Sequence, residues 1–191
     1  MSRRVWTAYR AWMSNLIPLL LVAPLPPIAY WLDNAFSFWY ALPVWALFPF
    51  ALWLSINFFG LFQNEKMKRE LSHKKPSGLY SVFCGFRRPS ASVYLHPHED
   101  LGWFVIGNDF VEFIGDRLNY KLQKNEVTAI RLVPNINSLL FLGGWVCIEA
   151  RSEGKRLRML IEPRENRTMT ANRKLRRELA KQLREKLIEQ R

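Results

Sequence analysis

Residues 12–32 read WMSNLIPLLLVAPLPPIAYWL, and residues 36–62 read FSFWYALPVWALFPFALWLSINFFGLF. Asp33 is the only charged residue in these two stretches or between them. A helix that spans a bilayer needs about 20 predominantly apolar residues, and both stretches reach this length. The sequence therefore predicts two membrane helices, joined by a short polar turn at Asp33-Asn34, in a transmembrane hairpin over residues 1–62.

Prolines are frequent in this hairpin, and three of them fall close together at Pro24, Pro26 and Pro27. A proline inside a helix removes a backbone hydrogen bond and kinks or breaks the helix. Broken membrane helices can mark transport sites. No Lys, Arg, Glu or His lies in either stretch to serve an ion or proton relay, so a kinked anchor is favoured over a transporter.

Basic residues flank the hairpin on both sides, whereas its tip contains no Lys or Arg. Cytoplasmic segments next to membrane helices carry an excess of Lys and Arg. The pattern predicts a multi-pass protein of the plasma (inner) membrane with both termini in the cytoplasm. The flanking residues are Arg3, Arg4 and Arg10 before the first helix, and Lys66, Lys68, Arg69, Lys74 and Lys75 after the second.

The chain of 191 residues has a formal net charge of +12, and all but three of its 28 Lys and Arg follow the hairpin. Residues 63–91 are interpreted as a basic juxtamembrane linker, which would be attracted to the anionic inner leaflet. In an alternative interpretation these charges only enforce the topology. With no nucleic-acid-binding motif in the chain, nucleic acid is not an expected partner. The candidate membrane-surface contacts are Lys66, Lys68, Arg69, Lys74, Lys75, Arg87 and Arg88.

Two short segments have open or unremarkable interpretations. Residues 78–86, GLYSVFCGF, are apolar and aromatic, and could dock on a folded domain or lie in the bilayer interface. The HPHED run, residues 96–100, has two histidines beside two carboxylates, but a closed metal site needs more ligands, so a solvated loop is expected. No metal or cofactor is predicted.

Cys84 and Cys147 form no CxxC pair, and Cys147 is expected in the core.

Residues 92–191 are predicted to form a β domain. Short apolar runs alternate there with turn signals, and Leu157, Met159 and Ile161 alternate with arginines, as is typical of strands with one wet face. A loop is expected at 134–138, and 139–142 could begin the sixth strand early. The seven predicted strands are 92–95, 102–106, 110–114, 119–122, 127–133, 145–150 and 156–161.

The end of the chain predicts an amphipathic helix over about 170–190. Leucines recur there every four residues, with charged residues between them. Thr168 or Thr170 is a suitable N-cap. The helix could cover the β domain with its leucine stripe, lie on the membrane, or pair with another copy of the chain, and the first interpretation is favoured.

Seven antiparallel strands followed by one amphipathic helix resemble the pleckstrin-homology (PH) superfold. The run GWFVIGNDFVEFIGDRLNYKLQKNEVTAI, residues 102–130, resembles the opening of bacterial PH-like and GRAM-like domains. The resemblance implies an antiparallel β barrel or sandwich that acts as a binding or scaffolding module. Glu99 and Asp100 stand where such domains place basic residues for inositol lipids, which argues against that ligand.

The chain is therefore expected to be an α+β membrane protein in which a PH-like module is anchored at the inner leaflet. Motifs of common enzyme classes, such as GxSxG and HExxH, are missing, so no catalytic residues are predicted. The alternatives are an accessory subunit of a larger transport or envelope complex and, less favoured, an enzyme of unrecognised type. Expected partners are the lipid bilayer and a protein partner or second copy, bound through the membrane helices or the C-terminal helix.

Overall fold

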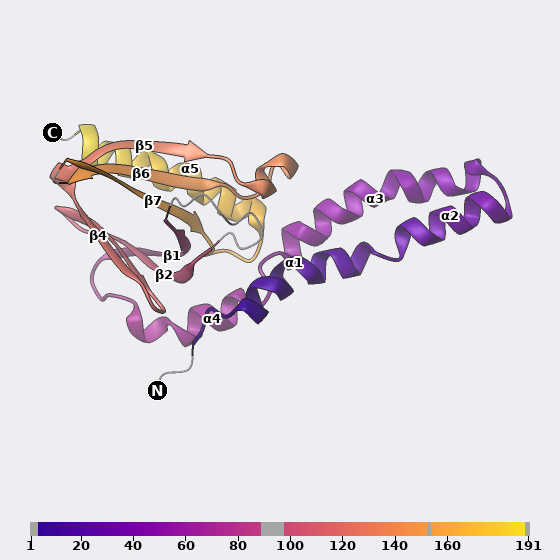
Figure 1. Cartoon of the computed structure of the whole chain (residues 1–191), viewed down its shortest axis with the longest axis horizontal. Coiled ribbons are helices and arrows are strands. Elements are labelled where there is room, and N and C mark those ends of the chain that lie inside the picture. Colours follow the sequence, from indigo (N-terminus) through magenta and orange to yellow (C-terminus); the bar gives the residue numbers. More distant parts are fainter. Residues whose placement is uncertain (1–3, 89–97, 153, 190–191) are drawn as a thin grey trace. The chain divides into compact units, whose positions relative to one another are not determined.

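The computed structural model of the chain consists of two compact units (Figure 1). Ala8–Gln63 forms a helical hairpin, and the residues on both sides of it in the chain, Met1–Thr7 and Asn64–Arg191, together form a β domain. The protein is thus α+β, with two long apolar helical spans and a seven-stranded antiparallel sheet. The structure describes residues 4–88, 98–152 and 154–189.

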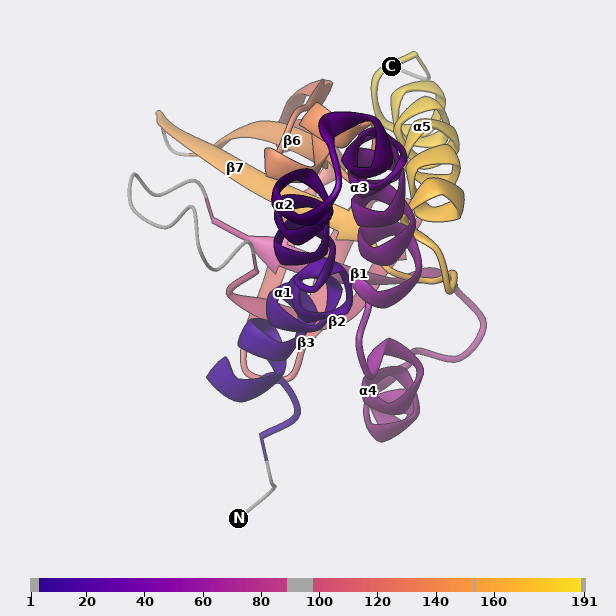
Figure 2. The ribbon, with the colours of Figure 1, turned by 90° about the vertical axis from the view of Figure 1, so that its right-hand side faces the viewer.

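Three helices make up the hairpin: α1 (Ala8–Val22), α2 (Leu25–Ala35) and α3 (Phe38–Phe59). Figures 1 and 2 show α3 running alongside α1 and α2. The spans Ala8–Ala35 and Phe38–Glu70 are long and apolar enough to cross a membrane. Most of their large apolar side chains are exposed.

The first span is interrupted at Ala23-Pro24, where α1 ends and α2 begins. Proline has no N–H group to donate, so the cluster of prolines ends one helix and starts the next. The expected turn at Asp33-Asn34 is instead the last part of α2, where Asn34 Nδ2 donates to Tyr30 O. The chain reverses one step later, between Ala35 and Phe38.

The β domain begins with α4 (Asn64–Glu70) and a 3-10 turn, η1 (Ser72–Lys74). All neighbouring strands are antiparallel, and the sheet order is β4-β3-β2-β1-β7-β6-β5. Among the described residues β4 and β5 are unpaired edges, so the strands form an open sheet and not a closed barrel. The strands are β1 (Tyr80–Arg87), β2 (Asp100–Ile106), β3 (Phe110–Gly115), β4 (Asn119–Gln123), β5 (Val127–Val133), β6 (Trp145–Ser152) and β7 (Lys155–Pro163).

The central strand β1 lies in the segment that sequence patterns assign to a linker. Of the two interpretations of residues 78–86, association with the folded domain agrees with the structure, in which Tyr80–Arg87 is a strand of the sheet and pairs with β2 on one side and β7 on the other. Both faces of this strand are buried from Val82 to Phe86, which explains its continuous apolar run. The predicted strand at 92–95 lies outside the described residues.

The six later strands agree with their predicted positions to within two residues. Residues 139–142 do not begin β6, because a 3-10 helix, η3 (Ile136–Leu140), occupies this region. A second short 3-10 turn, η2 (Lys124–Glu126), connects β4 to β5.

The C-terminal helix α5 (Met169–Arg184), continued by a π-helical turn η4 (Glu185–Glu189), covers β5, β6 and β7 (Figure 1). Its Leu179, Leu183 and Leu187 are buried in the main core. Thr168 is the N-cap, as expected, and its side chain accepts a hydrogen bond from Ala171 N–H. The leucine stripe therefore packs on the sheet and is not available to a membrane or a second copy.

Candidate functional site

Glu162, near the end of β7, is the centre of a buried polar cluster. Its Oε2 atom lies 2.9 Å from Nε2 of His98, whose side chain is 4% exposed. Its Oε1 atom accepts hydrogen bonds from Asn135 Nδ2 at 2.7 Å and from Gly144 N–H at 3.0 Å. One carboxylate therefore connects β7 to His98, two residues before β2, and to both ends of the segment between β5 and β6.

Arg164 extends this cluster toward α4. Its Nε atom donates to Asn64 Oδ1 at 3.1 Å, and Asn64 Nδ2 donates back to Arg164 O. Its Nη1 atom lies 3.5 Å from Nδ1 of His98. We refer to His98, Glu162, Arg164 and Asn64 as the buried cluster.

The partners in the cluster define its charges. Burial lowers the pKa of His98, and the neighbouring Glu162 opposes this only in part. The neutral ring that fits these partners carries its proton on Nε2, toward Glu162, and accepts from Arg164 at Nδ1. Burial tends to raise the pKa of Glu162, but His98 and Arg164 bring it below its usual value. Burial lowers the pKa of Arg164 to about 10, so it remains charged at neutral pH.

The chain is bound to the β domain both where it enters the helical hairpin and where it leaves it. Trp6 is 8% exposed, and its indole Nε1 donates to His98 O at 3.0 Å. The Arg164 guanidinium lies 5.7 Å from the centre of the Trp6 ring. Val5 N–H donates to Asp116 Oδ2 at 2.7 Å. We call Val5-Trp6 and Asn64 the hairpin roots, because they flank Ala8–Gln63 and both belong to the β domain.

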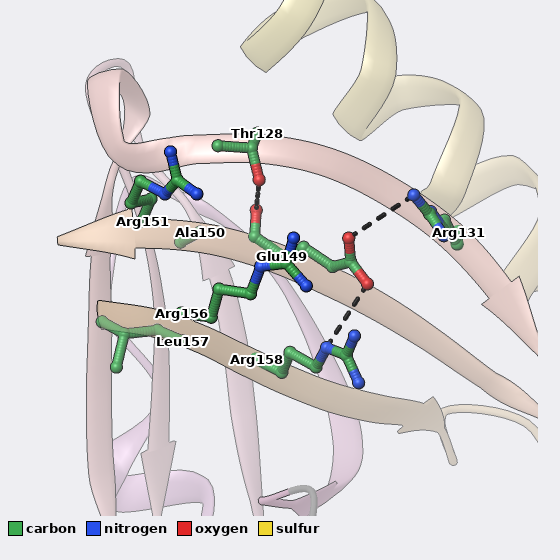
Figure 3. A pocket seen from close by; sticks show the side chains of 8 residues that line it. All are labelled: Thr128, Arg131, Glu149, Ala150, Arg151, Arg156, Leu157 and Arg158. Carbon is green, nitrogen blue, oxygen red and sulfur yellow. Dashed lines mark hydrogen bonds and ion pairs between the residues drawn. The ribbon is translucent and has the colours of Figure 1, made fainter. Parts of the chain in front are cut away.

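A second candidate site is a groove on the outer face of β5, β6 and β7, with a volume of about 340 Å³ (Figure 3). Four of its eight lining residues are arginines, supplied by all three strands. We call it the arginine groove. Its lining residues are Thr128, Arg131, Glu149, Ala150, Arg151, Arg156, Leu157 and Arg158.

The charges of the groove are unequal. Glu149 lies between Arg131, at 3.7 Å, and Arg158, at 3.4 Å, and orients both. Arg151 and Arg156 face each other across β6 and β7, an arrangement of like charges that is unfavourable by itself. In the described part of the chain, which omits Glu153, no carboxylate pairs with these two. The groove thus concentrates positive charge and can attract an anion.

The lysines predicted to contact the membrane surface have several different environments. Lys68 pairs with the carboxylate of Glu165 and donates to its carbonyl, whereas Lys74 donates to two carbonyls of the β3–β4 turn at 2.8 Å. Lys75 lies 4.9 Å from the centre of the Trp103 ring. Lys68 and Lys74 therefore fasten α4 and η1 to the sheet, and Lys66 is exposed.

The three predicted arginines are also separated. Arg69 is exposed on α4, and Arg87 is partly buried at the end of β1. Arg88 Nε lies 3.0 Å from Glu99 Oε2, so its charge is balanced. The structure therefore does not unite the seven residues in one surface site, and their contact with lipid stays a prediction.

The expectation of a solvated HPHED loop is wrong for two of its residues. His98 belongs to the buried cluster, and Asp100 is fully buried. Asp100 Oδ2 accepts from the backbone N–H groups of Arg117 and Leu118, each at 2.8 Å, and so holds the β3–β4 turn. Both polar side chains can be buried because hydrogen-bond partners within the β domain take the place of water molecules. His96 lies outside the described residues.

Metal and thiol chemistry find little support in the described ranges. No group of three His, Cys, Asp or Glu side chains is placed there to hold a metal ion. Cys84 and Cys147 are free and buried, and burial raises the pKa of both thiols, which makes them poor nucleophiles. Comparisons of the chain with known protein families and with characterised proteins found no match.

Proposed function

We propose that the chain is a membrane-anchored, non-enzymatic binding module. In this proposal the helical hairpin crosses the inner membrane twice, and the β domain, with a PH-like fold, is held at the cytoplasmic leaflet. The arginine groove binds anionic groups of the lipid or of an acidic partner protein. The observation that carries the proposal is that both hairpin roots are bound to the same β domain.

The roots constrain how the hairpin can cross a membrane. Trp6 precedes the hairpin and Asn64 follows it, and both are fixed in one folded domain. A segment whose two ends lie on the same side must cross a bilayer an even number of times. The interruption at Ala23-Pro24 divides the first span without adding a crossing, which supports two passes, Ala8–Ala35 and the α3 span.

Orientation and fold class are supported by charge and element order. Basic residues lie on the side of the roots and none at the tip, as in proteins whose termini face the cytoplasm. Seven antiparallel strands followed by a helix that packs on the sheet are the element order of the PH superfold. Because a fold alone does not define a ligand, the binding role rests on the groove.

Cysteine labelling tests the topology. Asp33, which is exposed near the hairpin tip, and Lys155, which is exposed on β7, are replaced singly by cysteine in the full chain. The native thiols are buried, so a membrane-impermeant maleimide reports on the added cysteine. In intact spheroplasts we expect labelling of D33C alone, with K155C labelled only after permeabilisation. Labelling of both variants, or of K155C alone, would contradict the proposed topology.

Substitution of Arg151 and Arg156, which pair with no carboxylate among the described residues, tests the binding role. The full chain in neutral phosphatidylcholine nanodiscs is titrated with inorganic tripolyphosphate by calorimetry at low salt. Each exposed pair of an Arg with an anion contributes up to about 1 kcal/mol, so R151Q/R156Q is expected to weaken tripolyphosphate binding by up to roughly 30-fold.

The control variant K174Q/K181Q removes two positive charges from the exposed face of α5, outside the groove. It should leave the affinity within a few-fold of the parent. Equal losses in both variants would mean that binding is diffuse and that the groove is not a site. The titration is then repeated in anionic phosphatidylglycerol nanodiscs. If this lipid weakens tripolyphosphate binding to the parent but not to R151Q/R156Q, lipid head groups occupy the groove.

A further inference from the structure

The segment between β5 and β6 presents large apolar side chains to the outside of the β domain. Ile136, Leu139 and Phe141 are 61%, 80% and 71% exposed. Side chains of this size are normally buried, and several of them exposed together on one short loop mark an interaction surface. We call Asn135–Gly144 the apolar loop; it follows the arrowhead of β5 in Figure 1.

Local hydrogen bonds hold this loop in one shape. Asn135 and Ser138 form a reciprocal cap, in which Ser138 N–H donates to Asn135 Oδ1 and Asn135 N–H donates to Ser138 Oγ. Phe141 adopts a left-handed conformation, with φ of 58°, and Leu142 beside it is fully buried. Gly144, at φ of +116°, approaches Arg176 so closely that a Cβ atom would collide with it. The apolar side chains are thus held outward by a rigid base.

Charge accompanies the apolar tip. Arg173 on α5 donates from Nη1 to Phe141 O, and its guanidinium lies 5.7 Å from the centre of the Phe141 ring. An aromatic ring paired with a cation at the edge of an apolar surface suits the headgroup layer, where rings and basic side chains are both favourable.

The base of the apolar loop lies at the same end of the β domain as the hairpin roots. Asn135 Nδ2 and Gly144 N–H both bind Glu162, which also contacts His98, the partner of Trp6. Arg164, which lies two residues after Glu162 in the chain, binds Asn64. The points where the chain enters the hairpin and the loop that carries exposed apolar residues are therefore joined through one small cluster.

We propose that the apolar loop inserts into the interfacial layer of the bilayer, as a third membrane contact beside the two spans. The inference rests on the proposed function, because the bilayer is the partner that the hairpin brings to the roots. The rigid loop would fix the orientation of the β domain and keep the arginine groove at a constant position. Ile136, Leu139 and Phe141 supply the inserted surface, at the shallow depth usual for interfacial contacts, about 5–10 Å.

The test places an environment-sensitive fluorophore on the loop. L139C in the full chain is labelled with a nitrobenzoxadiazole dye in phosphatidylcholine–phosphatidylglycerol nanodiscs, where the buried native thiols do not react. The control is N125C, exposed on η2 at the opposite end of β5, roughly 20 Å away. We expect blue-shifted emission at 139 and quenching by a lipid nitroxide placed near the head groups, with neither effect at 125.

A third label separates this inference from the proposed function. L47C lies in the middle of α3 with an exposed side chain, and reports whether the hairpin is in the bilayer. If 47 shows blue-shifted emission and 139 stays in water, the apolar loop does not touch lipid and the inference fails alone. If 47 is also in water, the anchor itself fails. Protection of 139 only when another protein co-purifies would assign the loop to a protein partner, and would likewise overturn the inference.

Discussion

Replacement of Glu162 by glutamine is expected to destabilise the β domain by about 3–5 kcal/mol, because it leaves the buried Arg164 without its countercharge. The substitution also creates a clash of donors. Glu162 Oε1 accepts from Asn135 and Gly144, while Oε2 faces His98. A glutamine amide group there either presents N–H to His98 Nε2–H or drives the ring proton to Nδ1, where it faces the N–H groups of Arg164. In detergent-solubilised full chain, the melting temperature should fall by roughly 10 °C.

The matched control is E178Q, because Glu178 is 54% exposed on α5 and pairs with Lys174 only at 4.0 Å. An exposed pair of this kind contributes about 0.3–0.5 kcal/mol, so its melting temperature should hardly change. If E162Q is as stable as E178Q, the buried cluster does not stabilise the β domain.

The parent should also lose stability in acid. The pKa of His98 is lower in the folded chain than its usual value of about 6.5, so the unfolded chain takes up the proton first as the pH falls. The neutral His98 ring thus contributes to folding stability above a pH of about 6.5, and this contribution is lost as the pH falls below that value. Glu162, whose folded pKa is lowered, adds a further loss at lower pH, below about 4.5, and E162Q should lack this second loss.

Truncation of Trp6 to alanine is expected to cost the β domain about 3–5 kcal/mol, although the residue precedes the hairpin in the chain. The change removes a buried ring, its hydrogen bond to His98 O and its contact with the Arg164 guanidinium. Thermal unfolding and proteolysis of the full chain would measure the effect.

W6F should have a smaller effect, about 1 kcal/mol, because it keeps most of the packing and loses the hydrogen bond. W39A is the matched control, since Trp39 is 75% exposed on α3 and its removal leaves no cavity in the β domain. If W6A and W39A are equally mild, the amino-terminal root is not bound to the domain, and the argument for an even number of crossings is lost.

Local patterns in the sequence predict most of the β domain. Strands β2 to β7 show turn residues at their ends, and the alternation of Arg156 and Arg158 with apolar residues indicates the wet face of β7. The leucine spacing predicts α5 and the face it buries. These features are readable because each one depends on neighbours within the same segment.

The missed features depend on residues that are distant in sequence. β1 is buried on both faces, so its apolar run has no alternation and resembles an interfacial segment. The members of the buried cluster come from three separate places in the chain, up to 100 residues apart, and no local signal joins Asn64 to Arg164. The arginine groove likewise requires the register of β5, β6 and β7, which brings Arg131 near Arg158 through Glu149.

The position of β1 affects how the protein is made. This strand is synthesised directly after the hairpin, but its partner β7 emerges only near the end of the chain. At usual translation rates the delay is roughly 5–15 s. Throughout this interval the hairpin is complete while the domain that binds its roots cannot close. In the proposed topology, the order of synthesis favours membrane insertion of the hairpin before the β domain folds, and a chain that fails to insert exposes the hairpin and the open β7-side edge of β1 to aggregation.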